Sequence, residues 1–375
     1  MYKYNYVATC LFGLEKFVSD EIAALGYEKT EVMDGRIYFS ADISAVAGFN
    51  INSRYAERLF IDLGSFKALS FDDLFEGVKA LPLENWIGRN DAFPVKGHSI
   101  RSKLFSIPDC QKIIKKAAAE RLTAVYGASL PEVGIKYQIE FFIFKDRVTI
   151  MIDTSGAPLH KRGYRTEAND APLRETLAAA LVNISRPREN VITWDPFCGS
   201  GTIAIEAALM MSDRAPGLYR TFSAEQFPAV PESVWQNARE EAKSRIVNNG
   251  FIAFASDIDP MCIKTAEANA RRAGVSDMLK IFGMNALDIK KDDKRVTIVC
   301  NPPYGERLST VKECEKLYRE MGTVFSELSP WQIYILTSHP DFQKIYGKRA
   351  DKVRVLYNGM IKCGFYQYFR NNKVK

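Results

Sequence analysis

The sequence is poor in metal-binding residues and lacks long apolar runs. Its three histidines, His98, His160 and His339, lie far apart, and none of its seven cysteines forms a C-x-x-C pair. A zinc site or a disulfide framework is therefore not expected. No apolar stretch approaches the roughly 20 residues that a membrane-spanning helix needs, and residues 1–9 lack the basic region and apolar run of a signal peptide. We expect a cytoplasmic protein that binds neither a metal nor a membrane.

Strong net charge is also absent, but the charge is unevenly placed. The 375 residues carry a formal net charge of +6, and 47% of them are hydrophobic, which is ordinary for a globular protein. Residues 344–375 hold nine Lys or Arg against one acid, Asp351. This basic segment indicates either a polyanionic partner or a solvated basic surface. The length exceeds what one hydrophobic core usually serves, so two or more domains are expected.

The first 165 residues mix strands and helices in the manner of one or two α+β units. Short apolar runs predict the strands, and apolar residues at helical spacing, each closed by a glycine, predict two helices. The predicted strands are 4–9, 36–40 and 58–63, the helices are 14–25 and 109–126, and a hairpin joins 134–144 to 147–153 at Lys145-Asp146.

From about residue 166 onward, strands and helices alternate regularly. The predicted strands are 191–194, 251–256, 279–282, 296–300 and 332–337, and the helices are 202–211, 260–273 and 312–328. Short apolar strands separated by helices predict an α/β fold with a doubly wound, mostly parallel sheet covered on both faces. Strands 353–357 and 362–369, separated by Asn358-Gly359, predict a C-terminal antiparallel hairpin.

A glycine turn follows the first strand of this alternating region. It comprises Asp195, Pro196, Phe197, Cys198, Gly199, Ser200 and Gly201. Glycines let backbone N–H groups approach a ligand, and such turns form the ligand crevice of doubly wound sheets. A dinucleotide oxidoreductase needs an acid about 20 residues further on, whereas here an insertion over 212–250 delays the end of the next strand to Asp257. The turn therefore indicates a cofactor with amino-acid and ribose groups, or a connection that binds no ligand.

Polar side chains also follow the next two predicted strands. Asp257, Ile258 and Asp259 end the second strand, and Asn285, Ala286 and Asp288 follow the third. A carboxylate at Asp257 can accept hydrogen bonds from ribose hydroxyls, and Ile258 can lie against an adenine face. Asp259 can equally cap the helix that follows it. The positions after the third strand are those where an adenine edge would need partners.

The motif Asn301-Pro302-Pro303-Tyr304 is the sharpest feature of the sequence. It follows the predicted strand 296–300, so it lies at the same edge as the glycine turn. The prolines remove two N–H donors, and an amide oxygen with a fixed carbonyl can accept both hydrogens of an –NH2 group while a tyrosine stacks on the base. This arrangement predicts methyl transfer to an exocyclic amine by positioning and electrostatics. A rigid turn without function is the alternative.

The segments 195–201, 257–259 and 301–304, in this order, resemble the corresponding turns of the class I amino-methyltransferases. Residues 159–165 and 171–178 look like the junction and first helix of the THUMP-domain RNA guanine-N2 methyltransferases, and residues 214–217 and 220–222 are similar to that family. The resemblance implies a ferredoxin-like region over 1–65, a THUMP RNA-binding domain over 66–160 and a class I methyltransferase domain over 161–375. Family members often carry an acid at position 285, where this chain has Asn285.

The resemblance also implies the cofactor, the substrate and the roles of the residues. S-adenosylmethionine is implied as the cofactor, with residues 195–201 around its methionine part and Asp257 on its ribose. The implied acceptor is the N2 of a guanine in large-subunit (23S) ribosomal RNA, which Asn301, Pro302 and Tyr304 would hold and stack.

Basic side chains in the first half of the chain and at the junction predict RNA contacts. The predicted RNA-binding residues are Lys103, Lys112, Lys116, Lys161, Arg162 and Arg165. Half of helix 109–126 must face a core, so some of these charges could instead form its solvated face. Two other functions stay open. One is an adenine-N6 methyltransferase on RNA or DNA, because the motif grips any exocyclic amine; the other is a non-catalytic RNA-binding assembly factor.

Overall fold

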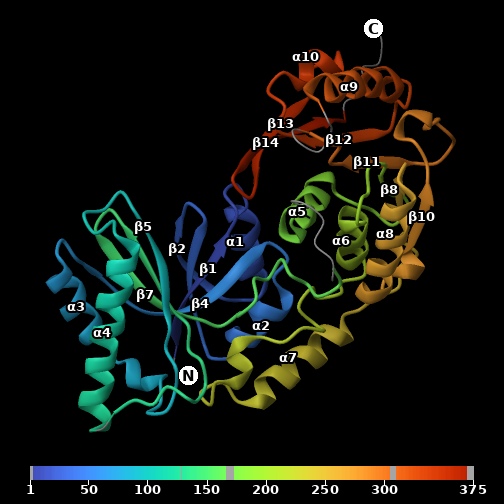
Figure 1. The fold of residues 1–375 in the computed structure, drawn as a ribbon. Helices are drawn as coiled ribbons and strands as arrows, with labels where there is room; N and C mark the ends of the chain where they lie inside the picture. Colours follow the sequence, from blue (N-terminus) through green and yellow to red (C-terminus); the bar gives the residue numbers. More distant parts are fainter. Residues whose placement is uncertain (1–2, 128, 166–172, 305–309, 370–375) are drawn as a thin grey trace.

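Two seven-stranded sheets organise this computed structural model, which describes residues 3–127, 129–165, 173–304 and 310–369 (Figure 1). The first sheet belongs to the N-terminal part of the chain and the second to the C-terminal part. Each sheet has its own helices, and buried side chains join the two parts into one continuous core.

One long strand is shared by both halves of the N-terminal sheet. The strands are β1 (Tyr4–Cys10), β2 (Glu28–Met33), β3 (Arg36–Ala41), β4 (Ala56–Lys67), β5 (Val95–Ile100), β6 (Ile139–Phe144) and β7 (Arg147–Asp153), in the order β2-β3-β1-β4-β7-β6-β5. β4 pairs with β1 along its first half and with β7 along its second. The longer helices beside this sheet are α1 (Glu15–Ala24), α2 (Ala45–Asn52), α3 (Phe71–Lys79) and α4 (Ile107–Tyr126).

The predicted hairpin of this region is present, but its first strand is shorter than expected. Lys145 and Asp146 both have positive φ, 49° and 65°, as a two-residue hairpin turn requires. The strand predicted over 134–144 begins only at Ile139. The backbone N–H of Gly134 instead donates to the carbonyl of Asn90 at 2.7 Å, so this stretch follows a loop rather than a strand.

The C-terminal sheet is parallel through five strands and ends in an antiparallel hairpin. Its strands are β8 (Ile192–Asp195), β9 (Ala253–Asp257), β10 (Leu279–Gly283), β11 (Val296–Cys300), β12 (Gln332–Thr337), β13 (Lys352–Asn358) and β14 (Ile361–Tyr368), in the order β10-β9-β8-β11-β12-β14-β13. Asn358 pairs with Ile361, so the turn consists of Gly359 and Met360, one residue later than predicted. Gly359 takes the positive φ, 65°, that this turn needs.

Helices cover both faces of the C-terminal sheet. α5 (Glu175–Ser185), α6 (Thr202–Met211) and α8 (Pro260–Ala273) lie on one face, and α9 (Val311–Ser326) and α10 (Phe342–Tyr346) lie on the other (Figure 1). Successive residues of β11 alternate between the two cores: Val299 packs with α5 and α6, while Ile298 and Cys300 pack with α9. A strand buried on both faces explains the unbroken apolar run 296–300.

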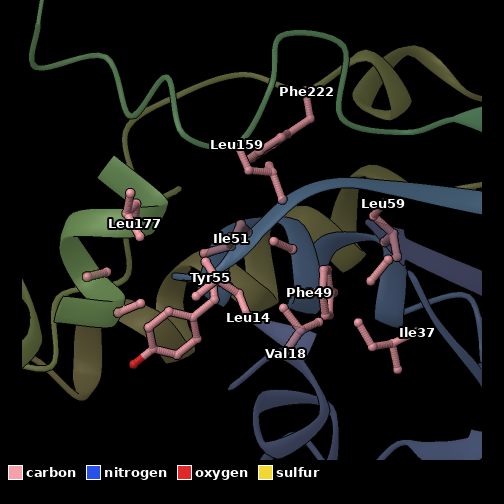
Figure 2. Close-up of a cluster of buried hydrophobic side chains, with 14 of the residues drawn as sticks. Leu14, Val18, Ile37, Phe49, Ile51, Tyr55, Leu59, Leu159, Leu177 and Phe222 are labelled. Atoms are coloured by element: carbon pink, nitrogen blue, oxygen red, sulfur yellow. The ribbon is translucent and has the colours of Figure 1, made fainter. Parts of the chain in front are cut away.

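The N-terminal units pack directly on α5 and on α7 (Glu232–Ser244), which belongs to the insertion. Figure 2 shows Tyr55 beside α5, the helix that carries Leu177, within the shared core. The Tyr55 hydroxyl accepts a hydrogen bond of 2.8 Å from Asn183. Gly217 approaches so closely that a Cβ there would lie 2.6 Å from the carbonyl oxygen of Asn50. These contacts hold the two parts of the chain in one arrangement.

Within the described residues, no group of three or more His, Cys, Asp or Glu side chains is placed to hold a metal ion. The seven cysteines, all of which lie in the described ranges, are free thiols. In the same ranges no helix combines the length and the apolar character needed to cross a membrane.

Candidate active site

Three loops with polar side chains meet at the carboxyl edge of the C-terminal sheet. β9, β8 and β11 are neighbours in the sheet and run parallel, so their carboxyl ends lie side by side. Asp195 ends β8, Asp257 ends β9, and Asn301 follows β11 directly. In a doubly wound sheet this edge is where ligands bind. The structure therefore brings together the three motifs that the sequence analysis singled out.

The glycine turn after β8 is held in place by backbone and side-chain hydrogen bonds from its neighbours. Gly199 and Gly201 have φ of 49° and 82°, the left-handed region that favours glycine. The N–H of Gly199 donates to Oδ2 of Asp257 at 2.9 Å, which ties the turn to the end of β9. The amide of Asn269, a buried residue of α8, donates to the carbonyl of Ser200 at 2.9 Å. The turn is thus fixed before any ligand arrives.

Asp195 is a buried carboxylate at the base of this turn. It is 2% exposed, and its Oδ1 accepts a hydrogen bond of 3.1 Å from the N–H of Phe197. Burial raises the pKa of Asp195 to about 8, the Phe197 hydrogen bond opposes this rise, and the charge of Asp257 adds to it. A buried carboxyl that ionises only near pH 8 is poised to charge when a cation is placed beside it.

The loop after β9 supplies one exposed apolar side chain and two carboxylates, Asp257 and Asp259, with different structural roles. Ile258 is 72% exposed directly after the strand, so its side chain is available to an aromatic ligand face. Oδ1 of Asp257 accepts from the N–H of Asp259 at 3.0 Å. Asp259 accepts from the N–H of Met261 at 2.8 Å and so caps α8, which is the alternative that the sequence allowed for it.

The residues after β10 form a short 3-10 turn. Asn285 accepts a hydrogen bond of 3.0 Å from the N–H of Leu287 and thereby caps the turn Ala286–Asp288. Asp288 is exposed and Ala286 is buried. The amide of Asn285 is thus already engaged through its oxygen, while its NH2 group stays a candidate partner for an adenine nitrogen.

Asn301 has the most telling environment of the predicted catalytic residues. Its Oδ1 is buried and has no hydrogen-bond partner among the residues that the structure describes. The carbonyl of Pro303, two residues on, accepts from the hydroxyl of Tyr318 on α9 at 2.9 Å, which anchors the motif to that helix. A buried acceptor without a donor costs free energy, on the order of 1–3 kcal/mol. Because this acceptor lies at the carboxyl end of a strand, where ligands bind, it suggests that a ligand supplies the missing hydrogen-bond donor.

Tyr304 lies differently from its predicted role in base stacking. It is 5% exposed, and its hydroxyl accepts a hydrogen bond of 3.2 Å from the amide of Asn358, at the end of β13. The side chain therefore connects the motif to the C-terminal hairpin. Stacking on a base stays a prediction that requires the ring to leave this contact.

Two residues that support the site were not identified from the sequence. Asn269 holds the glycine turn from α8, and Tyr318 holds the motif from α9. Asn269 occupies the buried face of its helix with Ala266, Ala270 and Ala273. A polar residue on an otherwise apolar helix face was the available signal, because a buried amide needs partners.

The predicted RNA-binding residues divide into exposed and engaged side chains. Lys103, Lys112, Lys116 and Lys161 are exposed, the middle two on α4. Arg165 is largely enclosed: it donates to the carbonyl of Leu173 at 2.9 Å and lies 3.5 Å from the Glu175 carboxylate. The exposed lysines stay candidates for RNA contacts.

Arg162 requires a correction, because its guanidinium is taken up inside the domain junction. The residue is 6% exposed and donates to backbone carbonyls of Leu159, Ser53 and Arg54. Its Nε lies 3.6 Å from Oε1 of Glu206, a fully buried residue of α6. Arg162 therefore joins the N-terminal unit to the helix that follows the glycine turn and does not face solvent where RNA would bind.

Family models match three separate parts of the chain. Residues 5–60 match the RlmL ferredoxin-like domain, residues 68–153 match the THUMP domain, and residues 162–367 match the RMKL-like methyltransferase domain. The last match alone covers more than half of the chain. The protein belongs to the RMKL-like methyltransferase family. The predicted family and its domain types are thereby confirmed.

Relatives and solved structures agree with this RMKL-like assignment. The chain is 42% identical over 373 residues to the putative RNA methyltransferase YpsC of Bacillus subtilis, covering 98% of this chain and 97% of YpsC. It is 31% identical over 371 residues to the ribosomal RNA large subunit methyltransferase K/L of Legionella pneumophila, covering 97% of this chain but only 52% of that protein. The chain thus spans about half the length of the K/L relatives.

Two crystal structures share the whole fold of this RMKL-like protein. SMU.472, a putative methyltransferase complexed with SAH, is 38% identical with a TM-score of 0.93 and full coverage of both chains. A predicted N6-adenine-specific DNA methylase from Listeria monocytogenes is 43% identical, also with a TM-score of 0.93, over 99% of this chain and 97% of that one. The predicted class I methyltransferase fold with its preceding ferredoxin-like and THUMP domains is confirmed.

Proposed function

We propose that this protein transfers a methyl group from S-adenosylmethionine to an exocyclic amino group of an RNA base. The observation that carries the proposal is the buried Oδ1 of Asn301 beside the glycine turn, which has no hydrogen-bond partner within the described part of the chain. An amino group of a base supplies the N–H donor that this oxygen lacks. By holding that hydrogen, Asn301 would fix the amine and return lone-pair density to its nitrogen, so that catalysis rests on positioning and electrostatics.

The carboxyl edge of the sheet fits the chemistry of S-adenosylmethionine. The left-handed glycine turn exposes backbone amides, Asp257 presents carboxylate oxygens for hydroxyl donors, and Ile258 offers an apolar surface to an adenine ring. Buried Asp195 suits a cationic amino group. The complex of SMU.472 with SAH, at 38% identity, supports this cofactor. When bound, S-adenosylmethionine supplies the activated methyl group, and these residues bind and orient the cofactor.

Cofactor binding is expected to weaken as the pH falls below about 8. Since burial raises the pKa of Asp195 to about 8, the free protein holds a proton there that a cationic ligand must displace. SAH affinity should therefore drop by about tenfold per pH unit below pH 8 and level off above it. Isothermal titration calorimetry from pH 6 to 9 measures this dependence and the released proton.

The control for this prediction is Asp195→Asn, which cannot ionise and should give a flat profile of SAH affinity against pH. A steep wild-type profile that persists in Asp195→Asn contradicts the assignment.

RNA is the substrate class that the domain content supports. The THUMP match over 68–153 and the exposed lysines on and near α4 fit an RNA-capturing unit ahead of the methyltransferase domain. YpsC is named a putative RNA methyltransferase, and the K/L relatives are named for large-subunit ribosomal RNA. We propose the N2 of a guanine in 23S ribosomal RNA as the acceptor.

Adenine N6 is the second candidate acceptor. The amide oxygen of Asn301 can accept a hydrogen bond from any exocyclic amine, and the Listeria protein at 43% identity is described as a predicted N6-adenine-specific DNA methylase. A guanine-N2 enzyme and an adenine-N6 enzyme would therefore differ only in their contacts to the rest of the base. The methylated nucleoside that is produced distinguishes the two.

A labelling experiment tests the proposed reaction. The purified protein is incubated with tritiated S-adenosylmethionine and, in parallel, unmodified 23S ribosomal RNA, transfer RNA and duplex DNA, followed by nucleoside analysis. Label in ribosomal RNA as N2-methylguanosine is the expected result. Label as N6-methyladenosine would replace the acceptor with the second candidate. Measurable SAH binding with no label in any nucleic acid would favour a non-catalytic RNA-binding assembly factor.

A further inference from the structure

Two hollows lie at the edge of the C-terminal sheet opposite the candidate active site. One, of about 450 Å³, opens at the amino ends of β8, β11 and β12, and the other, of about 470 Å³, opens between α1 and the β13–β14 hairpin. They share Arg186, Arg188 and Gln332 and so form one continuous surface. We call it the far-edge surface. Its basic residues are Arg186, Arg188, Lys291, Lys294, Arg295, Lys352 and Arg354, against the acids Asp20, Asp292 and Asp293.

Most of these positive charges are not neutralised by neighbouring carboxylates. Within the described residues, Lys294 is paired, with Asp292 at 2.5 Å, whereas Arg186, Arg188 and Arg295 are exposed and have no ion pair. Burial raises the pKa of Tyr334, while the charges of Arg186 and Arg188 oppose that rise, so both guanidinium groups act on the same wall of the hollow. Unpaired arginines converging on a concave surface favour an anionic ligand.

The far-edge surface also includes part of the basic C-terminal segment, residues 344–375. Lys352 and Arg354 belong to β13, and Phe369, directly after β14, lines the second hollow. Phe369 is 37% exposed, and among the described lining residues it is the only large apolar side chain that is exposed. A protein-binding surface usually has a desolvated apolar centre, which the described lining residues of this surface do not form. Its charge suits a nucleic acid backbone better than an acidic protein.

The far-edge surface is too distant to touch the base that enters the active site. β11 starts beside it at Val296 and ends next to Asn301, and this stretch spans roughly 16 Å at about 3.3 Å per residue. One nucleotide cannot bridge that length. A folded RNA can, because phosphates on both sides of the target continue away from the crevice.

We propose that the far-edge surface binds the phosphodiester backbone of the RNA substrate at nucleotides outside the methylation site, with Arg186 and Arg188 as its central contacts. The proposal rests on the RNA methyltransferase function proposed above. The far-edge surface would hold the RNA at a second place, on the methyltransferase domain, in addition to the contacts that the N-terminal units make. Two separate anchors select RNA that is folded to reach both, which makes the far-edge surface a determinant of substrate class.

The test compares Arg186→Gln/Arg188→Gln with a matched variant, Lys264→Gln/Arg271→Gln, which removes two exposed charges from α8. Binding of fluorescently labelled, unmodified 23S ribosomal RNA is measured between 50 and 200 mM salt in the presence of SAH. The far-edge variant should lower the magnitude of the slope of log K against log salt by about 2. Its dissociation constant should rise on the order of tenfold at the lower salt concentration. KM for the RNA should rise with it, while kcat and SAH affinity stay unchanged.

The outcomes separate the two proposals. Wild-type binding and methylation of the RNA, with equal slopes and equal dissociation constants for wild type and Arg186→Gln/Arg188→Gln, would overturn the far-edge surface and leave the proposed function intact. An equal loss in both double variants would also overturn it, since the effect would then reflect net charge alone. A wild-type protein that neither binds nor labels RNA would overturn both. Unchanged SAH affinity shows that the far-edge variant is folded.

Discussion

Asn301→Ala is expected to lower kcat by a factor of about 10²–10³ while leaving SAH affinity within about twofold of wild type. The size follows from the loss of one preorganised polar group at the reacting atom, which is worth roughly 3–4 kcal/mol in comparable sites. SAH affinity should hold because the cofactor would be bound by the loops after β8 and β9, whereas Asn301 follows β11. Single-turnover transfer of tritium at saturating RNA measures the effect.

The stability of the same variant should move in the opposite direction. Because Oδ1 of Asn301 is buried and no described residue donates a hydrogen bond to it, removing it deletes a polar group that the folded protein desolvates without compensation. Asn301→Ala should therefore be as stable as wild type or more stable, by up to roughly 1–3 kcal/mol. A matched control is Asn183→Ala, which removes an amide that is bonded to Tyr55 at 2.8 Å. It should lose about 1 kcal/mol and keep its activity.

This pair of variants has a clear contrary result. If Asn301→Ala unfolds at markedly lower urea than wild type, its amide has a structural partner and the argument from an orphan acceptor fails. If it stays folded and transfers methyl groups at the wild-type rate, Asn301 does not hold the amine.

The site loops could be predicted from the sequence because their signals are local. Each follows a short apolar strand, and glycine, proline and helix-capping residues restrict the backbone strongly over a few positions. The predicted bounds 202–211, 260–273 and 296–300 are those of α6, α8 and β11. The order of a doubly wound sheet then brings their ends to one edge without further information.

Other features escaped prediction because they depend on contacts far along the chain. β2 is nearly all exposed, and α2 has six of its eight residues buried, so neither shows the periodicity of an amphipathic element. Arg162 looks like a phosphate ligand among basic neighbours, yet its partners lie up to 109 positions earlier in the chain. The position of Tyr304 likewise depends on Asn358, 54 residues away. A lone charged or aromatic residue carries no local sign of such partners.

Arg162→Met is expected to destabilise the folded protein by about 3–5 kcal/mol, the largest stability effect that the structure predicts. The change removes the cation that lies 3.6 Å from the fully buried carboxylate of Glu206, and it leaves the carbonyls of Leu159, Ser53 and Arg54 without their donor. Glu206 would keep the hydrogen bond of 3.0 Å from the hydroxyl of Tyr164, which cannot offset a buried charge. Urea unfolding monitored by tryptophan fluorescence measures the loss.

The pH dependence and a second variant identify the buried charge as the cause. Burial already raises the pKa of Glu206, and Arg162 opposes that rise, so Arg162→Met should raise it further. A carboxyl whose folded pKa is raised favours the folded state at low pH and loses that advantage as pH rises through the folded pKa. The deficit of Arg162→Met relative to wild type should therefore be smaller at pH 5 than at pH 8. Arg162→Met/Glu206→Gln should recover part of the loss at pH 8, because its buried side chain is neutral. An equal deficit at both pH values, with no recovery in the double variant, would assign the destabilisation to the lost carbonyl contacts instead.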